Sequence, residues 1–333
     1  MDVLSTVLRG VRLTGAFFFE NIAYGEWAIV TPWLTEIAHV MPLHEHIISF
    51  HVVTEGTCWV ELYDGSAPPV RLSAGDVVVL PKGDEHVMAS SRGMRAQPNY
   101  SDFDIPPGRQ LPLHSIVNEA AGGPVTCHFV CGFFGCDATP FNPLLEALPP
   151  IFRATTSPAN RSLLSHLADA GVEESEKNRT ARDTKLARLA ELMFVEVVRQ
   201  HIDGLPQESR GWLSAVKDRH VGRALQLIHA KPADDWTLEG LARGVGLSRS
   251  VFAERFVNLV GVPAAQYLSR WRLQLASRYL EESGTSIAEA AAEVGYESEA
   301  AFRRAFKKYV GASPAAWRRA RLTAMGQELP PQI

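Results

Sequence analysis

Apolar positions recur at helical spacing twice within the last hundred residues, and the two copies align with each other. Leu238 and Ile287 are 49 residues apart, and Phe252 and Phe302 are 50 apart. A repeat at a fixed interval indicates one structural unit used twice. Each copy predicts a short helix, a turn that opens at glycine, a serine at the start of the next helix, and a second helix. This is the helix-turn-helix plan, and the two units span residues 236–261 and 286–311.

The second helix of such a unit enters the major groove of DNA. Ser248 and Ser298 are N-cap residues in this interpretation. Arg304 can bond a guanine edge through two nitrogens, whereas Arg303 and Lys307 suit phosphates better. A long helix over 263–282 separates the two units and is expected to set the two reading helices about one DNA turn apart. The residues predicted to face DNA are Arg249, Ser250, Ala253, Glu254 and Asn258 in the first unit and Glu299, Ala300, Arg303, Arg304 and Lys307 in the second.

Residues 1 to about 150 have a different pattern. Short runs of β-branched and aromatic residues alternate with glycine-containing turns such as Gly56, which predicts an antiparallel β-barrel or sandwich. From about residue 143 the pattern becomes helical. An apolar stripe containing Leu186, Leu189, Met193, Val197 and Ile202 then predicts a helix over about 180–201. The expected strands are 47–53, 58–63, 77–80 and about 124–134.

Length and charge refine this division. A chain of 333 residues suits two domains and a connector. The net charge is −4, but from Trp212 onward 17 Lys and Arg stand against 12 Asp and Glu, whereas 16 stand against 25 before it. A basic C-terminal part suits phosphate binding. No apolar run of about 18 residues predicts a membrane span, and no signal peptide is evident, so we expect a cytoplasmic protein.

The C-terminal part resembles the AraC/XylS family of transcription regulators over about 221–319. The motifs that carry the resemblance are Trp236-Thr237-Leu238, Gly246-Leu247-Ser248, Gly295-Tyr296 and Phe302-Arg303-Arg304. The resemblance implies that positions 250, 253, 254, 300 and 304 face bases. Ala253 and Ala300 are small, so Arg304 is the strongest candidate for sequence recognition.

The segment from Gly75 to His86 fits the second cupin motif, in which a strand leads into a tight turn that presents a histidine to a barrel interior. Cupin enzymes combine this histidine with a His-x-His pair and a glutamate to bind a metal. His44 and His46 supply a pair here, but Ser49 stands where the glutamate is expected. The part over about 5–205 resembles the cupin-like sensor domain of an AraC subgroup. The motifs that carry this resemblance are Glu55-Gly56, Cys58-Trp59, Gly75-Asp76-Val77 and Val130-Cys131-Gly132.

Three alternatives follow for the barrel interior. The residues that could hold Zn²⁺ or Fe²⁺ are His44, His46, His51, His86 and Cys131, since imidazole and thiolate suit both ions. These histidines could instead bond backbone groups inside a ligand-binding barrel. Cys127, Cys131 and Cys136 could also sense oxidants, because a thiol beside an imidazole can ionise.

The predicted fold class is α+β multidomain: a cupin-like β-barrel followed by helices, then an all-α domain with two helix-turn-helix motifs. The expected domains are a sensor over 1–150, a helical connector over 151–206 and a DNA-binding domain over 212–321. The helix over 180–201 either forms a homodimer interface, as the resemblance implies, or caps the barrel.

The leading hypothesis is a transcription regulator, for instance an activator, that responds to a small-molecule or redox signal, binds double-stranded promoter DNA and acts on RNA polymerase. The alternative is a metal-dependent cupin enzyme with a helical appendage. The missing motif glutamate argues against an enzyme, and an enzyme has no need of two DNA-reading units.

Overall fold

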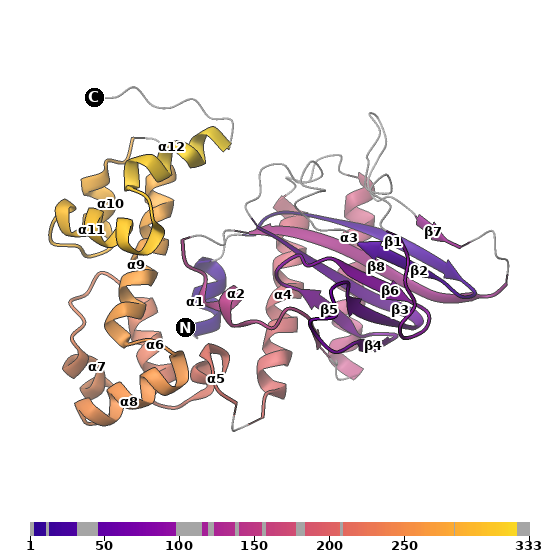
Figure 1. The fold of residues 1–333 in the computed structure, drawn as a ribbon, viewed down its shortest axis with the longest axis horizontal. Helices are drawn as coiled ribbons and strands as arrows, with labels where there is room; N and C mark the ends of the chain where they lie inside the picture. The colour runs from indigo at the N-terminus through magenta and orange to yellow at the C-terminus, as the bar shows by residue number, and fades with distance from the viewer. Residues whose placement is uncertain are drawn as a thin grey trace. The chain divides into compact units, whose positions relative to one another are not determined.

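The computed structural model describes residues 3–10, 13–31, 46–97, 115–118, 123–136, 140–154, 158–177, 184–206, 209–282 and 284–324. The chain forms two compact units, one helical and one built on a β-sheet. Figure 1 shows the order of the elements in each. None of the described helices is long and apolar enough to cross a membrane.

The helical unit is assembled from three separate stretches of the chain: the first helix, the segment around residues 140–147, and everything from Leu205 onward. Its described helices are α1 (Val3–Gly10), α2 (Pro143–Ala147), α5 (Trp212–Lys217), α6 (Val221–Ala230), α7 (Leu238–Gly244), α8 (Arg249–Val260), α9 (Ala264–Glu281), α10 (Ile287–Glu293), α11 (Glu299–Val310) and α12 (Pro314–Ala324).

Helix α1 lies in a region for which the sequence predicted β-structure, and that prediction was wrong for this stretch. Val3, Leu4 and Val7 are buried. Val3 and Val7 are four residues apart and therefore share one helical face. This face packs against α6 and α2 of the helical unit. A helix of eight residues, about two turns, carries too little periodicity to be recognised before its packing partner is known.

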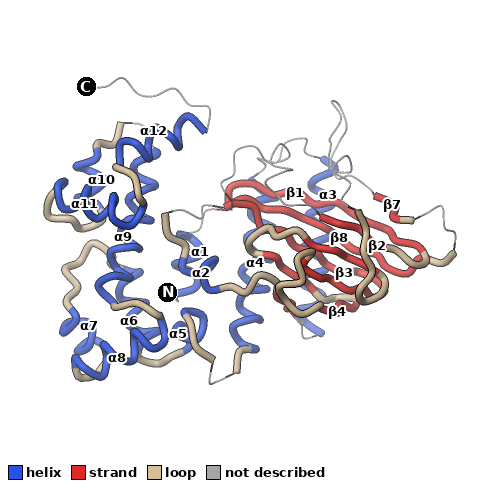
Figure 2. The backbone as a smooth tube through the Cα atoms, viewed as in Figure 1, coloured by secondary structure: helices blue, strands red, loops and turns tan. Residues whose placement is uncertain are grey.

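The second unit is a curled sheet covered by two helices. Nine described strands form the sheet, with β2, β6, β3, β8, β1 and β7 as its main path. Figure 2 shows these strands in red. The elements are β1 (Leu13–Tyr24), β2 (Ala28–Thr31), β3 (His46–Leu62), β4 (Val70–Ser73), β5 (Val77–Leu80), β6 (His86–Ala89), β7 (Ser115–Val117), β8 (Val125–Cys136), β9 (Phe152–Ala154), α3 (Pro158–Lys177) and α4 (Thr184–Gly204).

Strand β3 joins the two parts of the sheet. The sequence predicted two strands separated at Gly56, but the structure has one strand of 17 residues. Its first half pairs with β5 and β8, and its second half pairs with β4 and β6. Gly56 has φ +78°, and a Cβ there would lie 2.1 Å from the backbone oxygen of Thr126. Glycine therefore lets the strand bend and continue where we expected a turn.

Helix α4 packs on the sheet. The buried residues Met193 and Val197 belong to the stripe predicted for this helix, and α4 lies against β1, β9 and α3. Phe194 stacks edge-on against Phe134 of β8, with ring centroids 5.1 Å apart. Strand β9 still pairs with β5, so the sheet extends past residue 150. The apolar stripe of α4 is thus used within the chain.

Candidate nucleic-acid interface and sensor site

Both predicted helix-turn-helix units are present, and their ends are capped as the sequence indicated. The Ser248 side chain accepts a hydrogen bond from the backbone N–H of Val251 at the start of α8. The Ser298 side chain accepts one from Ala301 at the start of α11. Helix α10 also begins with a capping box, formed by Ser286 and Glu289. Four local side-chain contacts thus fix where the reading helices and α10 begin.

One face of each reading helix forms the core. Phe252 and Phe256 of α8 are fully buried, as are Phe302 and Phe306 of α11. Residues four apart lie on the same side of a helix, so the opposite side is left to solvent. The residues predicted to face DNA are found on this open side, where Arg249, Ser250, Glu254, Asn258, Ala300, Arg303, Arg304 and Lys307 are exposed, and Ala253 and Glu299 are partly so.

The two arginines of α11 differ in whether their side chains are hydrogen-bonded within the protein. Arg303 donates from Nε to Glu299 Oε1 over 2.5 Å, one helical turn away. Arg304 is exposed and has no hydrogen-bond or ion-pair partner in the part of the chain that the structure describes. A guanidinium without an internal partner can turn both of its terminal nitrogens towards a base edge. Arg304 therefore has the freedom that base recognition requires.

Helix α8 is held in place by an ion pair that the sequence analysis missed. Arg255 donates to both carboxylate oxygens of Asp218, and the shortest of these bonds is 2.5 Å. The same carboxylate accepts the backbone N–H groups of His220 and Val221 at the start of α6. Hydrogen bonds from Arg255 and these amides lower the pKa of Asp218 despite desolvation, which is the largest single contribution and acts in the opposite direction. Asp218 thereby ties the first reading helix to α6.

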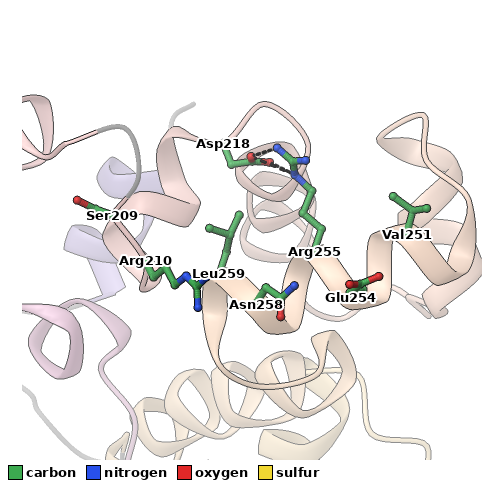
Figure 3. Close-up of a pocket in the computed structure, with 8 residues that line it drawn as sticks. All are labelled: Ser209, Arg210, Asp218, Val251, Glu254, Arg255, Asn258 and Leu259. Carbon is green, nitrogen blue, oxygen red and sulfur yellow. Dashed lines mark hydrogen bonds and ion pairs between the residues drawn. The ribbon is translucent and has the colours of Figure 1, made fainter.

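A shallow groove of about 450 Å³ runs beside α8 (Figure 3). Glu254 and Asn258, both predicted to face DNA, line it, and the Asp218–Arg255 pair stands at one side. The groove mixes both signs of charge with the half-exposed Val251. Its lining residues are Ser209, Arg210, Asp218, Val251, Glu254, Arg255, Asn258 and Leu259.

A central arginine of α9 connects the two helix-turn-helix units. Arg272 donates to the carbonyl oxygens of Pro232 and Asp234, which precede α7, and to that of Gly295, in the turn between α10 and α11. The turn that precedes α7 and the turn between α10 and α11 also meet directly, because a Cβ on Gly295 would lie 2.4 Å from the backbone oxygen of Ala233. The relative position of the two helix-turn-helix units is therefore set by backbone contacts as well as by the length of α9.

Inside the curled sheet, three predicted pocket residues come together. His51 on β3 pairs directly with Cys131 on β8. Its Nδ1 lies 2.8 Å from Cys131 Sγ, and its Nε2 lies 2.6 Å from His86 Nε2. Asn21 of β1, which the sequence analysis did not identify, donates to the same sulfur over 3.4 Å. All four side chains are at most 2% exposed.

The direction of these hydrogen bonds follows from their last member. His86 Nδ1 bonds the carbonyl oxygen of Asp84, which can only accept, so this nitrogen carries the proton. In a neutral ring His86 Nε2 then accepts from His51 Nε2–H, and His51 Nδ1 accepts from the Cys131 thiol. Burial supports these neutral states. It lowers the pKa of His86 to about 4, it lowers the pKa of His51 with a contribution from His86, and it raises the pKa of Cys131.

This arrangement does not fit one metal ion held by all three side chains. Cys131 and His86 contact opposite nitrogens of the His51 ring, and a single ion cannot reach both sides of an imidazole. No group of three His, Cys, Asp or Glu side chains within the described ranges is placed to hold a metal. His46 contacts the carbonyl oxygen of Pro81 instead. His44 lies outside the described residues.

The cysteines are buried, and all four are free thiols. Cys58 and Cys127 belong to the same apolar cluster as Cys131. A hydrogen bond with Cys127, together with burial, raises the pKa of the Cys58 thiol. Neutral, buried thiols are poor nucleophiles, so the interior favours packing and hydrogen bonding over rapid oxidation.

Comparison with known proteins agrees with both units. Residues 2–203 match a family model described as Cupin, and residues 241–320 match one described as Helix-turn-helix domain. A Streptomyces lividans protein described as an AraC-like transcription regulator is 30% identical over 320 residues, which cover 96% of this chain and 98% of that protein. The transcriptional regulator AlkR of Acinetobacter baylyi is 30% identical over 96% of this chain and 99% of its own length.

Among solved structures, the DNA-binding domain of the transcription factor AdpA in complex with a target DNA is 32% identical, and the match covers 33% of this chain and 99% of that domain with a TM-score of 0.31. The cupin model covers the sheet unit together with α1 and α2, the helix-turn-helix model runs from α7 to α12, and the full-length relatives span both matches. This chain belongs to the AraC-type transcription regulators that combine a cupin domain with a helix-turn-helix DNA-binding domain.

Proposed function

We propose that α8 and α11 read promoter DNA with their exposed faces and that Arg304 makes the principal base contact. The observation that carries this proposal is the combination of a buried phenylalanine pair on one side of α11 with an unengaged Arg304 on the other. Arg303 and Lys307 flank Arg304 on this side of α11 and suit phosphate contacts. On α8 the corresponding face is Arg249, Ser250, Ala253, Glu254 and Asn258.

The test is Arg304→Ala in the intact chain, measured against a duplex selected from a randomised library. Loss of a bidentate base contact should weaken binding by about 1–3 kcal/mol and relax the preference at one base position. Arg188→Ala is the matched control, because Arg188 is an exposed helical arginine of the other unit, paired with Glu191. Unchanged discrimination between the selected duplex and its single-base variants would reject the role of Arg304.

The cupin domain is proposed to sense the signal at the interior cluster of Asn21, His51, His86 and Cys131. A small molecule with complementary donors and acceptors is favoured over an oxidant, because burial raises the pKa of Cys131 and keeps its thiol neutral. Binding such a molecule would exchange internal hydrogen bonds for bonds to the ligand. The effect on DNA would then be a shift between arrangements of different DNA affinity.

Thiol titration of the folded chain with and without a chelator separates the possible signals. For a metal-free ligand site we expect slow thiol reaction in both conditions, and the same rate for both. Thiols that become reactive only after chelation would instead establish a bound ion. Rapid reaction with hydrogen peroxide, accompanied by a change in DNA affinity, would favour a redox signal.

The regulator is further proposed to act as a homodimer in the cytoplasm and to recruit or block RNA polymerase at a promoter, without catalysis of its own. Leu163 on α3 and Leu192 on α4 are large apolar side chains that remain 41% and 47% exposed, and they suit a contact with a second copy. Sedimentation of Leu192→Glu against the unmodified chain tests this contact. An unaltered dimer would place the interface elsewhere, and a monomeric parent chain would refute the dimer.

A further inference from the structure

The segment between β8 and β9 leaves the sheet and becomes part of the DNA-binding unit. Strand β8 ends at Cys136, and from Phe141 onward the chain packs with the helical unit until Ala147. We call residues 140–147 the arm. Residues 137–139 and 148–151 connect the arm to two strands of the sensor, so the arm is covalently attached to the sensor on both sides.

The arm is bound to α9, the helix that separates the two reading units. The backbone N–H of Phe141 donates to Gln274 Oε1 over 2.8 Å, and this bond is buried. The Arg270 guanidinium lies 3.9 Å above the Phe141 ring and also bonds Glu146 Oε1 over 2.6 Å. Asn142, itself buried, accepts the N–H of Leu145 and thereby shapes the short helix α2.

These contacts extend to a reading helix through one aromatic side chain. The Phe141 ring meets Tyr267 of α9 edge-on at 5.6 Å, and Tyr267 in turn meets Phe256 of α8 at 6.0 Å. The Tyr267 hydroxyl accepts a hydrogen bond from Trp212 Nε1 and bonds His229 Nε2, each over 2.8 Å. Tyr267 is 1% exposed. Displacement of Phe141 would therefore leave a void beside the Tyr267 ring, which contacts Phe256 of α8.

We propose that the α9 surface made by Tyr267, Arg270 and Gln274 is a docking site for the chain's own arm, and that the sensor's signal reaches α8 through this docking. The inference rests on the proposed function, because it requires a sensor that signals and a helix that reads DNA. The buried hydrogen bond between the arm and Gln274 supports this inference. The amide oxygen of Gln274 has the Phe141 N–H as its partner, and an undocked arm would leave both polar groups unsatisfied.

Because coupling between two sites is reciprocal, DNA can serve as the effector in a test for which the natural signal is not needed. Hydrogen exchange of the intact chain is measured with and without a duplex selected from a randomised library. We expect the duplex to slow exchange in α8 and α11 and also to change exchange in the arm and in β8. The change in the hydrogen exchange of β8 is the decisive measurement, because β8 belongs to the sensor.

Two arm variants interrupt the path by different means. Phe141→Leu keeps an apolar side chain but removes the aromatic contacts with Tyr267 and Arg270, and Glu146→Gln removes an ion pair whose acid is half exposed. In either variant the duplex should still protect α8 and α11, while the response of β8 falls by roughly half or more. Phe152→Leu and Glu191→Gln are the controls, since they alter a buried ring and an exposed ion pair in the sensor.

The outcomes separate the two proposals. A β8 response that is as large in both arm variants as in the unmodified chain overturns the coupling while leaving DNA binding intact. The same holds if the duplex protects α8 and α11 but changes nothing in the arm or β8 of the unmodified chain. If the duplex protects neither α8 nor α11, the proposed DNA reading fails, and the coupling inference fails with it.

Discussion

Two glycines at equivalent places in the two helix-turn-helix units allow the contact between these units to be measured. Gly246 follows α7 with φ +72°, and Gly295 follows α10 with φ +84°. A Cβ on Gly246 would meet nothing within 4 Å, whereas a Cβ on Gly295 would lie 2.4 Å from the Ala233 oxygen and 2.7 Å from the Ala233 Cα. The local strain is thus similar at both sites, and the crowding differs.

Alanine at a left-handed position costs about 1–2 kcal/mol of strain, and replacing glycine restricts the unfolded chain equally at both sites. These terms cancel when Gly246→Ala and Gly295→Ala are compared. What remains for Gly295 is the overpacking against backbone atoms of Ala233, which cannot rotate away as a side chain would. Overpacking costs about 1–3 kcal/mol, so we expect Gly295→Ala to be less stable than Gly246→Ala by that amount.

The assay is urea unfolding of the two variants and the unmodified chain, with DNA binding measured in parallel on a selected duplex and on each half of it. If the crowding displaces one unit relative to the other, Gly295→Ala should lose more affinity for the full duplex than for either half. Equal losses of stability, within about 0.5 kcal/mol, would refute the close approach of the two turns in solution. Equal affinity for the full duplex would refute its role in spacing the reading helices.

Three further changes test separate parts of the chain. Lys307→Ala should lower the slope of log affinity against log salt by about one phosphate contact, without altering base preference. Asp218→Asn should loosen α8 by weakening its bonds with Arg255, raising hydrogen exchange in α8 more than in α11. Burial lowers the pKa of His86 to about 4, so the unfolded chain binds a proton at this residue before the folded chain does. The contribution of His86 to the free energy of unfolding should therefore be constant above pH 6.5 and fall as the pH drops from there towards 4. His86→Gln should reduce this loss, by about 1.4 kcal/mol per pH unit, in acid unfolding curves.

The helix-turn-helix units were predictable because the information that defines them is local. A serine three residues before the amide that it caps, and phenylalanines four residues apart, are visible within one stretch of sequence. The structure confirms the caps at Ser248 and Ser298 and the burial of Phe252 and Phe302. The predicted contacts of the exposed residues with DNA remain predictions, because exposure is only a precondition for them.

What the sequence did not reveal depends on contacts between distant parts of the chain. Asn21 meets Cys131 across 110 residues, and Phe141 meets Gln274 across 133. No local pattern marks Asn21 as part of the interior cluster, and the sequence pattern placed residues 140–147 in the sensor domain over 1–150, whereas they pack with the helical unit. The error at Gly56 has a similar origin, since only the neighbouring Thr126 shows that this glycine is needed inside a strand.

The two arginines of α9 constrain what a signal arriving at this helix can do. Arg270 and Arg272 are two positions apart and therefore point to different sides of α9. Arg270 bonds the arm, while Arg272 bonds the carbonyl oxygens of Pro232, just before the first helix-turn-helix unit, and of Gly295, within the second. As long as the Arg272 bonds persist, a displacement of the arm has to move both helix-turn-helix units as one body or shift α8 locally through Tyr267. We therefore expect signalling to alter the presentation of α8 more than the distance between the two reading helices.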